Sequence, residues 1–173
     1  AAWGLGGVGL DFARLVRRSP VEDRVHATAV AVALAVGITC LGGIAAALLA
    51  HRWDVARAFL YSGLWGFIVA VYVSVAHRMI PFFTSSALPF IHAWRPFWVL
   101  QALLAVCAAE ALWPWLDWTG LGGSGWRAAL AVLECVAGAL VLYLAWAWGM
   151  AQSLRVRLLG MLHLGFSWLG IGL

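Results

Sequence analysis

Long apolar stretches alternate with short polar ones along this chain. The first, 27–50, carries no charged residue and would span roughly 36 Å as an α-helix, which is enough to cross a bilayer with some tilt. The later stretches of this kind are 55–76, 97–116, 128–151 and 158–173. The pattern predicts an all-α fold, a polytopic transmembrane helical bundle with about four full spans and partial spans at each end.

The polar connections between these stretches are short, so consecutive helices are expected to be antiparallel neighbours in one integral-membrane domain over 1–173. Residues 1–10 are expected to end a preceding helix, and 11–24 to form an arginine-rich connection. Because the sequence starts without Met and stops inside an apolar run, we expect an internal fragment of a longer membrane protein. Within the first span, Ala27, Ala31 and Ala35 form a stripe of small residues that favours close helix packing.

A proline-containing segment is expected to end the second span. Pro81 biases Ile80 away from the helical conformation, so we expect the helix to stop near Arg78 and a loop to cover 77–96. Arg78 has apolar neighbours on both sides. In a chain with so few charges, it is either an interfacial anchor or the partner of a buried anion.

Composition excludes an ordinary soluble domain. Hydrophobic residues make up 65% of the chain and charged residues 10%, whereas about a quarter of a soluble domain is charged. Twelve tryptophans are enough for a belt at the membrane interface. The net charge of +4 comes from arginines that lie between apolar runs, not on one basic stripe, so we expect the bilayer as a partner and no nucleic acid.

The arginines predict the orientation of the bundle. The alternating spans place eight of them on one side: Arg14, Arg17, Arg18, Arg24, Arg78, Arg95, Arg155 and Arg157. The other side receives Arg52, Arg57 and Arg127. The bias of eight to three predicts that the first side, with the segment 77–96, is cytoplasmic.

Four of the five histidines fall near that same side, which matters because histidine is a common metal and haem ligand. They are His26, His77, His92 and His163, whereas His51 lies on the opposite side. His163 is expected roughly 7 Å inside the last span, and an ionisable residue there suggests a function. For His77 and His92 we favour local hydrogen bonding at the water boundary. No diagnostic spacing such as HExxH supports a metal site.

Two carboxylates within the predicted spans form a second group of candidate residues. Glu110 and Glu134 should both lie roughly 10 Å below the outer surface on adjacent helices. Two carboxylates at matched depth cannot both stay charged unless they are paired. They are either an intramembrane proton or ion site or the partners of Arg57 or Arg127, and we weigh these alternatives equally.

The cysteines are expected to be packing residues. All three, Cys40, Cys107 and Cys135, fall inside apolar runs, where we expect buried small hydrophobes.

Two segments resemble the NnrS family. They are the proline-containing segment HRMIPFFTSSALP at 77–89 and LLGMLHLGFSWLGIGL at 158–173. The positions that match its two signatures are Arg78, Met79, Pro81, Phe82, Phe83 and Thr84 in the first and His163 in the second. The resemblance implies a polytopic protein of the bacterial inner membrane, containing haem and copper and linked to the nitric oxide response and nitrosative stress.

From this resemblance we expect a haem or haem–copper protein that handles or senses nitric oxide or a related small molecule. His163 is the first candidate for an axial or metal ligand, His26 the second cofactor candidate and His77 a further metal candidate. Arg78 would pair with a haem propionate. The alternatives are a cofactor-free proton- or ion-coupled transporter using Glu110 and Glu134, and a structural subunit. Whether the chain is an enzyme stays open.

Overall fold

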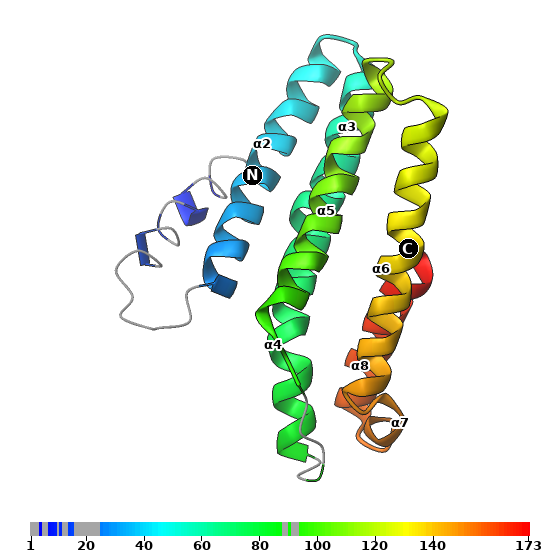
Figure 1. The fold of residues 1–173 in the computed structure, drawn as a ribbon. Helices are drawn as coiled ribbons and strands as arrows, with labels where there is room; N and C mark the ends of the chain where they lie inside the picture. Colours follow the sequence, from blue (N-terminus) through cyan, green and yellow to red (C-terminus); the bar gives the residue numbers. More distant parts are fainter. Residues whose placement is uncertain are drawn as a thin grey trace. The chain divides into compact units, whose positions relative to one another are not determined.

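Helices make up nearly all of the described structure. The computed structural model describes residues 25–87, 90 and 94–173, together with 4, 7–9, 11 and 14–15. These residues contain no strand, in agreement with the predicted all-α fold. The elements are α2 (Val25–Leu49), α3 (Trp53–Gly63), the π-helix η1 (Leu64–Val69), α4 (Ala70–Ala87), α5 (Phe97–Trp118), α6 (Ser124–Ala147), α7 (Met150–Ser153) and α8 (Arg157–Gly172), as drawn in Figure 1.

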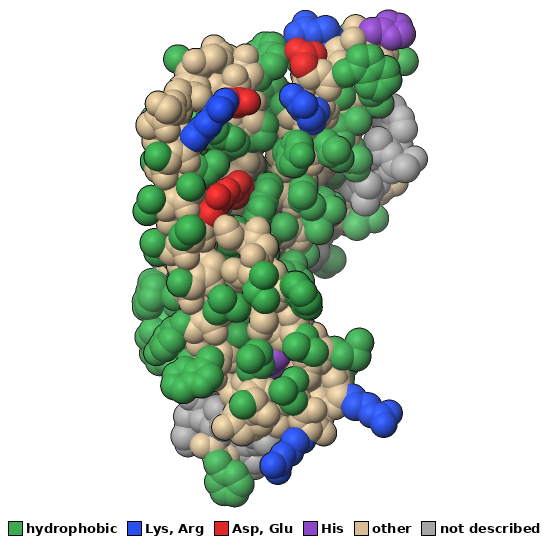
Figure 2. Space-filling view, turned by 90° about the vertical axis from the view of Figure 1, so that its right-hand side faces the viewer, with side chains coloured by type: hydrophobic (Ala, Val, Ile, Leu, Met, Phe, Trp, Pro, Cys, Tyr) green, Lys and Arg blue, Asp and Glu red, His purple; other side chains and the backbone are tan. Residues whose placement is uncertain are grey.

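Four helical runs are long and apolar enough to cross a membrane: Val25–Leu49, Trp53–Ala87, Phe97–Trp118 and Ser124–Ala147. This confirms the four predicted full spans. Hydrophobic side chains spread over the face shown in Figure 2, and few charged ones interrupt them. Such a surface suits a lipid bilayer, where every backbone polar group must be paired within the protein and helices meet that demand.

The expected end of the second span near Arg78 is wrong. Helix α4 continues through Pro81 to Ala87, so 77–87 is helix and not the start of a loop. A proline inside a helix removes one bond, here to the carbonyl of His77, whereas a loop in apolar surroundings would expose several backbone groups. The hydroxyl of Ser85 also donates to the Pro81 carbonyl at 2.8 Å. Helix α5 likewise continues through Pro114.

Other boundaries differ by a few residues. The fourth span was expected to reach residue 151, but α6 ends at Ala147. Gly149 follows with a φ of 88°, a left-handed conformation that favours glycine and turns the chain into α7. In the stretch expected to be a connection, residues 11, 14 and 15 are helical, and Arg14 pairs with Asp11 at 3.2 Å.

The chain divides into two compact units, which we describe separately. The first comprises 1–74 and 107–123, and the second comprises 75–106 and 124–173. Helices α4 and α5 each contribute residues to both units.

In the first unit, α2 packs closely on α3 and η1. A Cβ atom on Gly37 would lie 2.6 Å from the Phe67 ring, and one on Gly43 would lie 2.5 Å from the Phe59 ring. The predicted alanine stripe is therefore not the packing face, and its member Ala35 is exposed. The buried residues of α2 are His26, Ala33, Gly37, Cys40 and Ala47. Glycine lets the aromatic rings of the neighbouring helix approach the α2 backbone.

In the second unit, α6 runs beside α8 (Figure 1). A Cβ atom on Gly138 would lie 2.7 Å from the Gly170 carbonyl oxygen, so the two backbones approach closely at this point. Around this crossing, α6 buries Val141, Leu144 and Ala145. Tight backbone contact of this kind drives helix association in membranes, where lipid tails remove the hydrophobic driving force.

The Gly37 contact gives a stability prediction. We expect Gly37→Ala to destabilise the protein by about 1–3 kcal/mol, because the added methyl group would overlap Phe67. Gly42→Ala is the matched control, since a Cβ atom on Gly42 meets nothing within 4 Å. Thermal unfolding in detergent measures both variants. Equal melting temperatures for the two would contradict the close approach of α2 to η1.

Candidate functional site

Trp148 connects three segments of the second unit. Its ring stacks on Phe166 of α8, with centroids 5.4 Å apart and planes inclined by 25°. Its edge contact with His77 of α4 has a centroid separation of 6.1 Å. The indole Nε1–H donates to the carbonyl of Trp94, just before α5, at 2.8 Å. A single buried side chain therefore ties α4, α8 and the start of α5 together.

His77 is buried and is hydrogen-bonded to the backbone just before α5. Its Nε2 lies 3.2 Å from the carbonyl oxygen of Pro96. Because a carbonyl can only accept, this nitrogen carries the proton and is not a free metal ligand in this arrangement. The sequence favoured a local hydrogen bond at the water boundary, whereas His77 is buried and its bond reaches Pro96, 19 positions along the chain. A metal-binding role for His77 stays a prediction.

His163 has a different hydrogen-bonding pattern. It is fully buried on α8, and its Nδ1 lies 3.0 Å from the carbonyl oxygen of Leu159. Nδ1 therefore carries the proton, which leaves a lone pair on Nε2. That atom is buried without a hydrogen-bond partner among the described residues. An unsatisfied buried polar atom costs about 1–3 kcal/mol, so its presence calls for an explanation.

The pattern at His163 matches that of a ligating histidine. Such residues usually donate one ring N–H to a carbonyl or carboxylate, which fixes the tautomer and turns the other nitrogen toward the metal. Here Leu159 supplies the carbonyl, one helical turn before the ring. The described residues therefore offer a metal or haem iron one nitrogen, Nε2 of His163, and no cluster of three or more His, Cys, Asp or Glu side chains around it. The sequence pointed to His163 because of its expected depth in the membrane. The hydrogen bonds of the two rings are what distinguish His163 from His77 as a candidate ligand.

The second unit holds two further buried hydroxyl oxygens without a partner among the described residues, on Thr84 and Ser153. The sequence analysis missed both as site candidates. Thr84 belongs to the segment that resembles the family signature, which was the available signal. Ser153 lies in α7 and carried no signal.

The remaining cofactor candidates fall in different parts of the chain. His26 is buried on α2, in the first unit, so a joint site with His163 stays a prediction. Arg78 is exposed on α4, and its pairing with a propionate is likewise a prediction. His92 lies outside the described residues, and His51 is exposed.

The two carboxylates also fall in different units. Glu110 is 7% exposed on α5 in the first unit, and Glu134 is half-buried on α6 in the second. Their matched depth therefore stays a prediction. Cys40 and Cys107 are buried as expected, but Cys135 is exposed on α6, which corrects the sequence expectation. Within the described part of the chain, no group of three or more His, Cys, Asp or Glu side chains could hold a metal ion.

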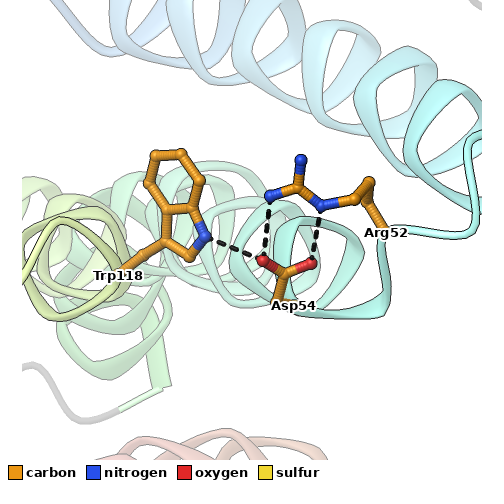
Figure 3. Close-up of polar contacts among 3 residues, drawn as sticks. All are labelled: Arg52, Asp54 and Trp118. Carbon is orange, nitrogen blue, oxygen red and sulfur yellow. Dashed lines mark hydrogen bonds and ion pairs between the residues drawn. The ribbon is translucent and has the colours of Figure 1, made fainter.

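A polar cluster of the first unit involves a tryptophan expected at the interface. Asp54 accepts two bonds from Arg52, at 3.3 and 3.1 Å, and a third from the Trp118 indole at 2.9 Å (Figure 3). The hydrogen bond to Asp54 raises the pKa of Arg52, which lies in the turn before α3. Because these residues lie at the ends of α3 and α5, the cluster fixes one end of the unit and holds no cofactor candidate.

Comparison with known proteins gives one match. A family model described as NnrS protein matches residues 4–173, nearly the whole chain, which confirms the resemblance seen in the two segments. No curated protein matches the chain. No solved structure matches it either.

The Trp148 contacts predict a specific effect on stability. Trp148→Phe keeps an aromatic ring but deletes the N–H that binds the Trp94 carbonyl, so we expect a loss of about 1 kcal/mol or more. Trp146→Phe is the control, because Trp146 is 68% exposed. Denaturant unfolding in detergent compares the two variants. If Trp146→Phe were as destabilising as Trp148→Phe, the role given to the indole bond would be wrong.

Proposed function

The chain belongs to the NnrS family, and from that premise we propose that it is a haem protein of the bacterial inner membrane, with copper as a second cofactor, that responds to or handles nitric oxide. The four apolar helices support the multi-pass location. Members of this family are associated with haem and copper, which supports the choice of cofactors.

His163 is the axial ligand in this proposal, and one observation carries it. Its Nε2 is buried without a partner in the described structure, while Nδ1 is held by the Leu159 carbonyl. That bond keeps the ring in one orientation and makes Nε2 a better electron-pair donor. Burial excludes water from the same nitrogen, so no solvent competes for it. A haem bound there would supply an iron able to bind nitric oxide.

In the second unit, two aromatic rings stack at the helix that carries His163. Phe166 lies one turn after His163 on α8 and stacks against Trp148, and both rings are fully buried. Because the rings stack on each other, they fix α8, and with it the backbone that carries His163. His77 makes an edge contact with Trp148 and is held by its bond to Pro96, so we assign it a positioning role.

Arg78 and His26 complete the proposal. Arg78 is exposed, and its guanidinium forms no ion pair with a described residue, so it is available to bind a propionate bidentately. His26 is the second candidate ligand, and His77 is the second candidate for copper. The arginine distribution supports a cytoplasmic location for the connection that follows α4.

An optical spectrum tests this function. The purified protein should show a Soret band and contain iron, and His163→Ala should lose the band while expression and the elution volume in detergent stay normal. His51→Ala is the control, since His51 is exposed in the turn between α2 and α3. His163→Gly with added imidazole should regain the band if the ring is the ligand. An unchanged spectrum in His163→Ala would remove His163 from the site.

A transporter without cofactor is the second candidate, supported by the burial of Glu110 within a span. In that case the purified protein should be colourless and metal-free. Proteoliposomes should then show proton-coupled uptake that Glu110→Gln or Glu134→Gln abolishes. A Soret band is expected for the haem protein and not for the cofactor-free transporter, so the spectrum of one preparation separates the two proposals.

A further inference from the structure

A cavity lies between α4 and α8 in the second unit. Its volume is about 440 Å³, within the usual range for ligand pockets. The lining is nearly all hydrocarbon, and among its described residues only Ser86 carries a hydroxyl group. The lining residues that define its length are Val75, Met79, Phe83 and Ala87 on α4 and Leu158 and Leu162 on α8.

This pocket is elongated along the helices. Its α4 residues recur every four positions from Val75 to Ala87, which corresponds to roughly 18 Å along the helix axis. One end lies where α4 finishes and α8 begins, because Ala87 and Val156 both line it. From there the lining continues along α4 to Val75, within a membrane-spanning run, and along α8 to Leu162. A long apolar ligand fits this length better than a compact one.

Two arginines lie next to the pocket in the chain. Val156 lines the pocket, and Arg155 and Arg157 flank Val156 in sequence without lining it themselves. Both arginines are exposed, and neither forms an ion pair with any described residue. Guanidinium groups bind phosphate through paired hydrogen bonds, and basic sites of this kind beside membrane helices bind anionic headgroups.

We propose that this pocket binds one acyl chain of an anionic phospholipid, whose phosphate is held by Arg155 and Arg157. The hydrocarbon lining accounts for the chain, and the two arginines account for the headgroup. A soluble anion would not use the apolar cavity, and a neutral apolar ligand would not use the two exposed arginines beside it. The site uses neither the free nitrogen of His163 nor any cofactor, so it is independent of the proposed function.

Photolabelling of the full chain in lipid nanodiscs tests the proposal. The probes are phosphatidylglycerol and phosphatidylcholine that carry the same photoreactive group on one acyl chain. We expect phosphatidylglycerol to label peptides that contain Met79 and Leu162, and phosphatidylcholine to label them far less. Each arginine near the surface contributes about fivefold to binding of an anionic lipid, so Arg155→Gln or Arg157→Gln should lower that labelling about fivefold.

Matched controls separate the pocket from general lipid contact. Leu162→Trp fills the cavity and should abolish the labelling, whereas Leu164→Trp on the exposed face of the same helix should not. Arg57→Gln removes a charge from the first unit and should have no effect. Equal labelling of the wild-type protein by both lipids would overturn the proposal, and that comparison requires no variant to fold. A porphyrin or a protein segment found in the pocket would overturn it too.

Discussion

Apolar surroundings force nearly every polar group of this chain to find a partner inside the protein. The four long helices satisfy their own backbones, and α4 and α5 stay helical through Pro81 and Pro114 because a loop would expose more unpaired groups. Against that rule, a buried polar atom without a partner is informative.

Two buried histidines of the second unit differ in this respect. His77 makes an edge contact with Trp148, and His163 lies shortly before Phe166 on α8. His77 donates its Nε2–H to the Pro96 carbonyl, whereas His163 donates Nδ1–H and its Nε2 has no partner among the described residues. That difference is why the proposed cofactor site is built on His163 and not on His77.

The hydrophobic pattern was sufficient to predict the fold class and the four spans, because bilayer thickness fixes the length of an apolar helix. The prediction failed at Pro81. A proline disfavours the helical conformation of the residue before it, but α4 stays helical there because its backbone groups need partners within the protein. Sequence spacing also misplaced the packing face of α2, since the contact depends on where Phe67 meets Gly37. The π-helix η1 has no sequence signal that we recognise. Depth in the membrane pointed to His163, but only three-dimensional hydrogen bonding distinguishes it from His77.

Electron paramagnetic resonance of the nitric oxide complex tests directly whether Nε2 of His163 binds the iron. Protein grown with ¹⁵N-labelled histidine should show a splitting from one histidine nitrogen bound to the iron, opposite the nitric oxide. That splitting should vanish in His163→Gly and return when unlabelled imidazole is added, now with the ¹⁴N pattern. A histidine splitting that persists in His163→Gly would show that His163 is not the ligand.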